Sequence, residues 1–309
     1  MSESSIRLGR VPPAAVADLL AAVDACAGRP LGAGSLVDVD IALAQARSFK
    51  LDVSFALTPD GAEGARFSLN DKGEPEAFRR RLVGHAEALG IDAALLAAQL
   101  RISPPGEVQT TLAVKWAPTR PPRVTVYFEE LTRSPRAEAI RRACFALGGV
   151  DMPPPPPGLD LVAACVDHSA GRAVAVKDYH LLTERAGTPL VALPAAVEPF
   201  RAPFGWHPVN GTRRFLLATR YAAGGGPIGS KLLWMSEVHR HETVGWAWAE
   251  VDRIRAAMRL PESRVGRSLD ALRATWTHAP GTFLYPDLVS LDVDADGTPQ
   301  GLVVYVSIR

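Results

Sequence analysis

Residues 49–57 read FKLDVSFAL, and this stretch alternates between apolar and polar side chains. Successive side chains of a β-strand point to opposite faces, so one face of this stretch is apolar and the other carries Lys50, Asp52 and Ser54. A turn-like segment, TPDGAEG, and a second alternating run, ARFSLN, follow directly. The stretch therefore predicts one arm of a β-hairpin that has an apolar face and an ionic face.

This hairpin belongs to a repeating unit. Only five of the 34 basic residues are lysines, and four of them lie in strand-like runs that are 65, 62 and 54 residues apart, namely Lys50, Lys115, Lys177 and Lys231. In each unit two alternating runs flank a turn, and an amphipathic helical stretch comes next. The pattern predicts hairpins over residues 49–70, 110–131, 159–182, 214–238 and 284–308. It predicts helices over residues 14–27, 76–89, 92–100, 136–147, 244–258 and 268–277.

The later hairpins keep the same parity. The runs TTLAVKW, VTVYFEE, VAVKDYHL and LVVYVSI each place aliphatic or aromatic side chains on one face and polar side chains on the other. If helices cover the apolar faces, the polar faces look at one another. A sheet of about ten antiparallel strands tends to close, because closure removes its unpaired edges. The sequence therefore predicts an α+β fold, a closed ten-stranded antiparallel β-barrel of five repeats with helices outside and a wet, basic, tyrosine-bearing lumen.

Length and composition fit one domain over residues 1–309. A hydrophobic content of 47% suffices for a core, and the net charge of +1 argues against nucleic acid as the main partner. The chain has three cysteines, and their odd number and their spacing do not suggest disulfide pairs. This favours a reducing, cytoplasmic environment. No segment resembles a signal peptide or approaches the ~20 apolar residues of a membrane span, so no membrane association is expected.

Three motif-like strings are assigned ordinary structural roles. DVDADG (residues 292–297) begins like a calcium loop but has Val303 in place of the final glutamate, so a hairpin turn is favoured. GGGPIGS lacks the Lys-Ser/Thr ending of a phosphate loop and is also expected to form a turn. Arg79, Arg80 and Arg81 are expected on a solvated helix face.

The inward set of cations and tyrosines carries the functional prediction. A single strand lysine is usually solvated, but four lysines in register with tyrosines are a different case. Converging cations that lack acidic partners repel one another and are costly to desolvate, unless a polyanion such as diphosphate binds among them. Tyrosines on the same faces add hydroxyl donors and ring faces that attract a cation.

Several of these segments resemble the metal-independent aromatic prenyltransferases of the αββα barrel type, which include dimethylallyltryptophan synthase-like and cyanobactin peptide enzymes. The resemblance runs from about Phe49 to the C-terminus. It rests on KLDVSF, ARFSLNDKG, AVKW, VTVYFEE, VAVKDYHL and LVVYVSI, and more loosely on the fourth hairpin. Two positions depart from the indole enzymes, which often have a lysine at Thr125 and an arginine at Ala175.

The resemblance implies roles for individual residues. Asp52 would be the catalytic base that accepts a proton from the acceptor. The diphosphate would be bound by Arg66, Lys115, Lys177, Arg220, Lys231, Tyr127, Tyr179 and Tyr305. The three tyrosines Tyr127, Tyr179 and Tyr305 would also shield the allylic cation. No cofactor would be required, and magnesium would not be essential, because the chain has no DDxxD-type motif and its cations would carry the diphosphate charge.

The implied activity is Friedel-Crafts transfer of a dimethylallyl or longer prenyl group from its diphosphate to an electron-rich aromatic acceptor, in secondary metabolism. An indole or tryptophan-type acceptor is favoured, with a phenol or a peptide side chain as the alternatives. A non-enzymatic barrel that binds an anionic or lipid-phosphate ligand, and a scaffold that presents a helical surface, also stay open. Asp52 could instead form an ion pair with Lys50 or Lys115 that only holds a strand.

Overall fold

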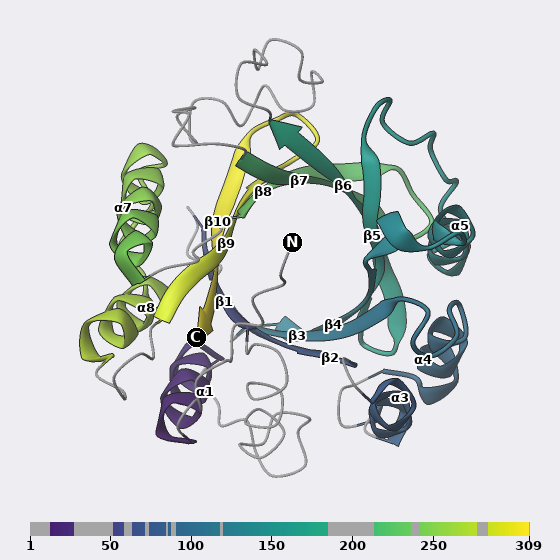
Figure 1. Cartoon of the computed structure of the whole chain (residues 1–309), viewed down its shortest axis with the longest axis horizontal. Helices are drawn as coiled ribbons and strands as arrows, with labels where there is room; N and C mark the ends of the chain where they lie inside the picture. Colours follow the sequence, from purple (N-terminus) through teal and green to yellow (C-terminus); the bar gives the residue numbers. More distant parts are fainter. Residues whose placement is uncertain are drawn as a thin grey trace, which may run out of the picture.

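The computed structural model describes residues 13–27, 52–58, 64–71, 74–84, 86–87, 91–117, 120–184, 213–235, 241–276 and 284–308. Ten strands within these ranges form one closed antiparallel barrel, as the alternating runs predict (Figure 1). The strands are β1 (Asp52–Leu57), β2 (Gly64–Asn70), β3 (Gln109–Ala117), β4 (Arg120–Glu129), β5 (Asp160–Ser169), β6 (Arg172–Glu184), β7 (Arg213–Ala222), β8 (Pro227–Met235), β9 (Leu284–Val293) and β10 (Pro299–Ile308).

The first and last strands close the barrel. β1 pairs with β2 on one side and with β10 on the other, so that Ser54 stands opposite both Arg66 and Tyr305. Each of the ten strands thus has two hydrogen-bonded neighbours. Closure leaves no unpaired strand edge in the sheet, which is the physical reason that the five hairpins adopt this form.

The connections between strands differ at the two ends of the barrel. At one end, which we call the hairpin end, the chain turns within each pair from β1–β2 to β9–β10. At the opposite end it passes through helical segments from β2 to β3, from β4 to β5 and from β8 to β9. The DVDADG string forms the turn between β9 and β10, where the Asp294 carboxylate accepts hydrogen bonds from the backbone N–H groups of Asp296 and Thr298. GGGPIGS lies at the turn between β7 and β8, also as predicted.

Helices surround the barrel on its outside (Figure 1). They are α1 (Pro13–Ala27), α3 (Pro75–Gly84), α4 (Ala93–Leu100), α5 (Ala137–Leu147), α7 (His241–Ala257) and α8 (Arg264–Thr275). α5 packs on β5 and β6, α7 on β9, and α8 on β1 and on α1. All six lie where the sequence predicts helices, with ends shifted by a few residues. None of the helices in the described ranges is long and apolar enough to cross a membrane.

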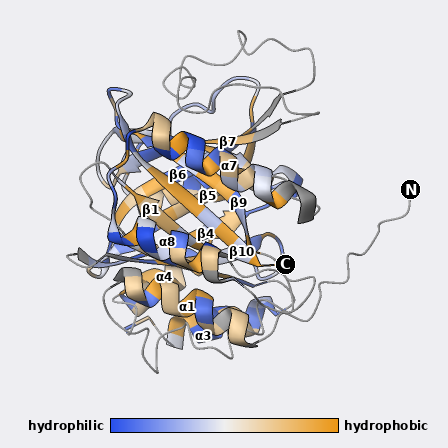
Figure 2. Cartoon of the chain, turned by 90° about the vertical axis from the view of Figure 1, so that its left-hand side faces the viewer, coloured by the Kyte–Doolittle hydropathy of each residue, from blue (hydrophilic) through white to orange (hydrophobic). Residues whose placement is uncertain are grey.

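The main hydrophobic core lies between the outer face of the barrel and these helices. Phe55, Phe67 and Phe128 point outward from their strands and are buried in one cluster with helix residues such as Leu19 and Phe145. The strands are largely hydrophobic, whereas α7 and α8 carry both hydrophobic and hydrophilic residues (Figure 2). Burial of this apolar face therefore fixes which side of each strand looks outward.

The outer face also contains a buried ion pair beneath α5. Arg141 is completely buried, and its Nη2 atom lies 2.8 Å from Oδ2 of Asp178 on β6. The same guanidinium donates to the backbone carbonyl of Pro153 at 2.9 Å. The expectation of a purely apolar outer face is thus wrong at Asp178, because α5 supplies a matching cation. The pair ties α5 to the sheet.

We predict that Arg141→Ala lowers the free energy of unfolding by about 3–5 kcal/mol, because it leaves the buried Asp178 carboxylate uncompensated. Arg142→Ala is the matched control, since Arg142 is exposed on the same helix. It should change stability by no more than about 0.5 kcal/mol. Urea unfolding of both variants tests this, and equal stability would contradict a structural role for the pair.

Candidate active site

The inner face of the barrel collects six basic side chains toward the hairpin end. Arg66 on β2 stands opposite Lys115 on β3, and Lys115 stands opposite Arg123 on β4. Farther round the barrel, Lys177 on β6 stands opposite Arg220 on the neighbouring strand β7. Lys231 on β8 completes the set, which is Arg66, Lys115, Arg123, Lys177, Arg220 and Lys231. Register alone therefore brings together cations that are far apart in the chain.

Lys177 is paired with an acid, contrary to the expectation of cations without acidic partners. Its Nζ atom lies 2.8 Å from Oδ1 of Asp167, and Thr125 donates its hydroxyl to the same oxygen at 2.6 Å. Arg123 lies 3.9 Å from the other carboxylate oxygen. Burial alone would raise the pKa of Asp167, but Lys177 and Arg123 lower it to about 2. Burial would likewise lower the pKa of Lys177, and Asp167 raises it above its ordinary value.

A second lysine is paired in the same way. Lys231 Nζ lies 2.5 Å from Oδ2 of Asp292 on the neighbouring strand β9. Ser290 donates to the other oxygen of Asp292 at 2.9 Å. Despite the opposing effect of burial, Lys231 lowers the pKa of Asp292 below its usual range. Two of the three described inner-face lysines thus carry their own counter-charges.

Lys115 is the third, and no ion pair joins it to any of the described residues. Burial, followed by the neighbouring charge of Lys231, lowers the pKa of Lys115 to about 8. Arg123 and Arg66 act in the same direction, and Asp292 opposes them. Both burial and like charges disfavour the charged form of Lys115, and an anion bound at this point would offset them.

Arg66 is held among the tyrosines. Its Nη1 atom donates to the hydroxyl of Tyr127 at 2.8 Å, and its guanidinium carbon lies 4.6 Å from the ring centroid of Tyr305. The rings of Tyr127 and Tyr179 are 6.0 Å apart. The structure therefore brings these predicted residues together, with Arg66 stacked as a cation on aromatic faces.

The tyrosines belong to an apolar part of the lumen. A second buried cluster, separate from the outer core, lies on the inner face. It consists of Ala113, Tyr127, Ala163, Cys165, Tyr179, Ala218, Leu233 and Tyr305, with Leu216, Leu288 and Val303 packed against it. The small alanines alternate with large rings in the register, since Tyr179 stands opposite both Ala163 and Ala218. The cations therefore adjoin an apolar, aromatic wall.

Glu129 lies at the opposite end of β4 from Arg123. Its Oε2 atom accepts hydrogen bonds from Gln109 Nε2 at 2.7 Å and from the Thr111 hydroxyl at 2.6 Å. All three residues are on the inner-face parity of β3 and β4, where Gln109 stands opposite Glu129. The lumen thus has a cationic hairpin end and a hydrogen-bonded carboxylate near the opposite end.

The structure gives less information on three residues that the sequence predicts to face the lumen. The backbone of Asp52 stands opposite Ser68 and Ser307 in the register, whereas its side chain lies outside the described residues. Lys50 lies outside them altogether. Arg220 stands opposite Lys177, and its Nε atom is buried without a hydrogen bond from the described residues. The proposed base therefore stays a prediction.

The sequence pattern does not identify the inner-face acids Asp167 and Asp292 as residues of the site. LVAACVDHS places Asp167 on the same parity as Cys165, so alternation alone could have oriented it inward. Its pairing with Lys177 is diagonal, because Lys177 stands opposite Cys165 and not opposite Asp167. Only the register between strands shows such a contact.

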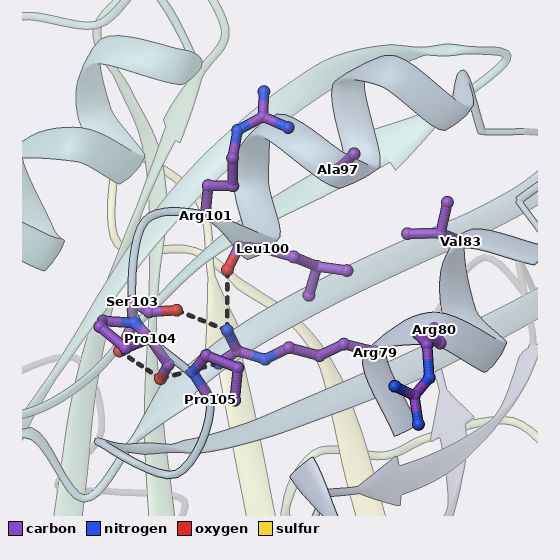
Figure 3. Close-up of a pocket in the computed structure, with 9 residues that line it drawn as sticks. All are labelled: Arg79, Arg80, Val83, Ala97, Leu100, Arg101, Ser103, Pro104 and Pro105. Atoms are coloured by element: carbon purple, nitrogen blue, oxygen red, sulfur yellow. Dashed lines mark hydrogen bonds between the residues drawn. The ribbon is translucent and has the colours of Figure 1, made fainter. Parts of the chain in front are cut away.

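A pocket of about 550 Å³ lies outside the barrel, between α3, α4 and the segment after α4 (Figure 3). Arg79 reaches across it and donates to the carbonyl of Leu100 at 2.9 Å and to the Thr110 hydroxyl at 2.8 Å. Arg79 is only 8% exposed, so its expected place on a solvated face is wrong. Its guanidinium is occupied by acceptors at the end of α4, which gives it a structural role.

None of the described residues forms a group of three or more His, Cys, Asp or Glu side chains that could hold a metal ion. The carboxylates of Asp167 and Asp292 are each held by a lysine. The described part of the lumen therefore offers anion-binding groups and an aromatic wall.

We predict that Lys177→Ala lowers the free energy of unfolding by about 3–5 kcal/mol at pH 7, because it leaves the buried Asp167 carboxylate without its counter-charge. Lys115→Ala, the matched control, removes a lysine whose charge is already disfavoured, and should change stability by about 1 kcal/mol or less. Urea denaturation compares the two variants. A Lys177→Ala protein as stable as Lys115→Ala would mean that the pair with Asp167 contributes nothing to the fold.

No family model matches the chain, and no curated protein matches it in sequence. Solved structures do match. The 6-dimethylallyltryptophan synthase from Micromonospora olivasterospora, in complex with DMASPP and Trp, has a TM-score of 0.63 at 17% identity and covers 96% of this chain and 97% of its own. The 5-dimethylallyltryptophan synthase from Streptomyces coelicolor gives 0.61 at 18%, covering 96% and 92%. The prenyltransferase PriB, in a ternary complex with L-tryptophan and dimethylallyl thiolodiphosphate, gives 0.58 at 19%, covering 97% and 92%. The chain therefore has the fold of these prenyltransferases over almost its whole length.

Proposed function

We propose that residues 1–309 form one enzymatic domain, an aromatic prenyltransferase that transfers an allylic group from its diphosphate to an electron-rich ring. The observation that carries this proposal is the lumen itself, where a cluster of six cations adjoins an apolar wall bearing three tyrosines. Barrels of the same fold are solved with an allylic diphosphate analogue and tryptophan together. An indole or tryptophan-type acceptor is therefore favoured.

The cations would act on the leaving group. Ionisation of the allylic C–O bond leaves both electrons on the diphosphate oxygen, and fixed positive charges stabilise that developing anion in a site with lowered dielectric. Arg66 and Lys115 are the first candidates, since they stand side by side in the register. Lys177, Arg220 and Lys231 would complete the anion site from the other side of the barrel.

The tyrosines would act on the carbon fragment. Tyr127, Tyr179 and Tyr305 are all buried in the inner apolar cluster. Their ring faces would stabilise the allylic cation and exclude water that would otherwise capture it. The aromatic acceptor would then attack the cation from the same apolar wall, forming the new carbon–carbon bond.

A carboxylate would take the proton that the acceptor loses. Asp52 is the proposed general base, and it occupies a position on β1 between Ser68 of β2 and Ser307 of β10. Glu129 is the competing candidate, because it is an inner-face carboxylate on the same strand as Tyr127. Whichever accepts the proton, the base lies on a different strand from Lys177 and Lys231.

We also propose that the reaction needs no magnesium, because side-chain cations are available to carry the diphosphate charge that the ion would otherwise carry. Cytoplasmic residence is proposed from the thiols of Cys144 and Cys165, which are both free and buried. A role in secondary metabolism stays a prediction.

Incubation of the purified protein with dimethylallyl diphosphate, L-tryptophan and excess EDTA should yield a prenylated product, detectable by mass spectrometry. A phenol and an aromatic peptide are run in parallel, and geranyl and farnesyl diphosphates test the donor length. Activity that is abolished by EDTA and restored only by magnesium would contradict metal independence. Donor binding without transfer to any acceptor would favour an anion-binding carrier.

Asp52→Asn should reduce kcat by roughly 10²–10⁴-fold and leave the Kd for donor nearly unchanged, because it keeps the shape and removes the proton acceptor. Glu129→Gln is the comparison variant and should retain most of the rate if Asp52 is the base. Single-turnover rates and donor binding are measured for both. The reverse pattern would assign the base to Glu129, and wild-type rates in both variants would remove each from that role.

A further inference from the structure

Asp167 places a negative charge inside the cation cluster. It is only 1% exposed, and one carboxylate oxygen receives both Lys177 and Thr125. The other oxygen, Oδ2, is buried without a hydrogen bond from any described residue. Its near neighbour is Arg123 Nη1, at 3.9 Å. A carboxylate in this position weakens the local positive field.

The position of Asp167 in the register sharpens this effect. On its two sides stand Thr125 and Ala175, neither of which carries charge. Lys177, the nearest cation, therefore has its charge offset by Asp167 before any ligand arrives. An anion that approaches Lys177 has to share that lysine with a fixed carboxylate or displace it.

Lys231 repeats the arrangement on the other side of the cluster. Asp292 holds it at 2.5 Å and is itself fixed by Ser290. Lys115 differs, since it has no ion pair with any described residue. The lumen thus contains two compensated lysines, Lys177 and Lys231, and one lysine, Lys115, whose charge no described carboxylate offsets.

We propose that Asp167 limits the affinity of the lumen for diphosphate, so that the product anion can leave after transfer. The inference rests on the proposed function and deepens it. Asp167 acts as a positioning residue through Lys177, which it holds in place while lowering the net charge that the anion meets. The strongest binding point for the anion is then Lys115.

This arrangement has a kinetic consequence. A site with six uncompensated cations would bind free pyrophosphate as strongly as the donor, and product release would then limit turnover. Two internal carboxylates reduce that affinity without removing the hydrogen-bond donors that stabilise the leaving group. Removing one carboxylate should therefore tighten product binding and slow turnover.

Asp167→Asn keeps the side-chain oxygen for Lys177 and Thr125 and removes the charge. Isothermal titration with inorganic pyrophosphate should show a Kd that falls roughly 10- to 100-fold, as expected for one charge several Å away at an effective dielectric of about 20. Steady-state kinetics should show stronger product inhibition by pyrophosphate and a lower kcat, with a faster first turnover relative to later ones. A purely structural residue would not tighten anion binding when it is changed.

Asp178→Asn is the matched control. Asp178 is equally buried and lies one residue from Lys177, but it faces outward and pairs with Arg141. Its loss should change the pyrophosphate Kd by no more than about 3-fold, because the charge lies on the far side of the sheet. Thermal unfolding of all variants reports whether each folds.

Asp292→Asn is the second test variant and should tighten pyrophosphate in the same direction, so a failure of Asp167→Asn to fold leaves the proposal testable. Wild-type protein that binds pyrophosphate, with Asp167→Asn binding it equally or more weakly, would overturn this inference and leave the proposed function standing. Absence of pyrophosphate binding in wild type and in both variants would overturn the anion site and the inference together.

Discussion

In a closed barrel, every second side chain of each strand faces an enclosed space, and charge in that space must be balanced. This constraint explains the inner face of the protein. Lys177 and Lys231 are balanced by aspartates on neighbouring strands, and Arg66 donates to a tyrosine hydroxyl and stacks on an aromatic ring. Lys115 has no such partner among the described residues, and burial together with the neighbouring positive charges lowers its pKa. The unbalanced charge marks the point where an anion is favoured.

The same constraint gives the lumen a direction. Basic side chains gather toward the hairpin end, and the leucines and alanines of the inner cluster adjoin them around the tyrosines. Glu129, with Gln109 and Thr111, lies near the opposite end. A donor with an anionic head and an apolar tail matches this gradient, with its head among the cations and its reactive carbon beside the rings. Electrostatic stabilisation and exclusion of water then arise from one arrangement of strands.

Much of the fold could be predicted from the sequence, because a period of two residues is a strong signal when one face is buried under helices. Phe55 and Tyr127 are oriented correctly by alternation alone. Alternation could not identify the lysine partners of the acids. Asp167 on β5 contacts Lys177 on the neighbouring strand β6 diagonally, and this contact depends on the register between the strands. Arg79 and the Arg141–Asp178 pair were missed for a related reason: long-range packing buries polar groups that local periodicity assigns to solvent or to an apolar face.

We propose that the cationic hairpin end of the lumen holds the diphosphate and the tyrosine wall holds the prenyl chain. A crystal structure of the protein with dimethylallyl thiolodiphosphate tests it most directly. We expect the diphosphate within hydrogen-bond distance of Arg66 and Lys115, and the dimethylallyl carbons against Tyr127, Tyr179 and Tyr305. Diphosphate bound outside the barrel, for example among the arginines of the pocket beside α3 and α4, with an empty lumen, would contradict it.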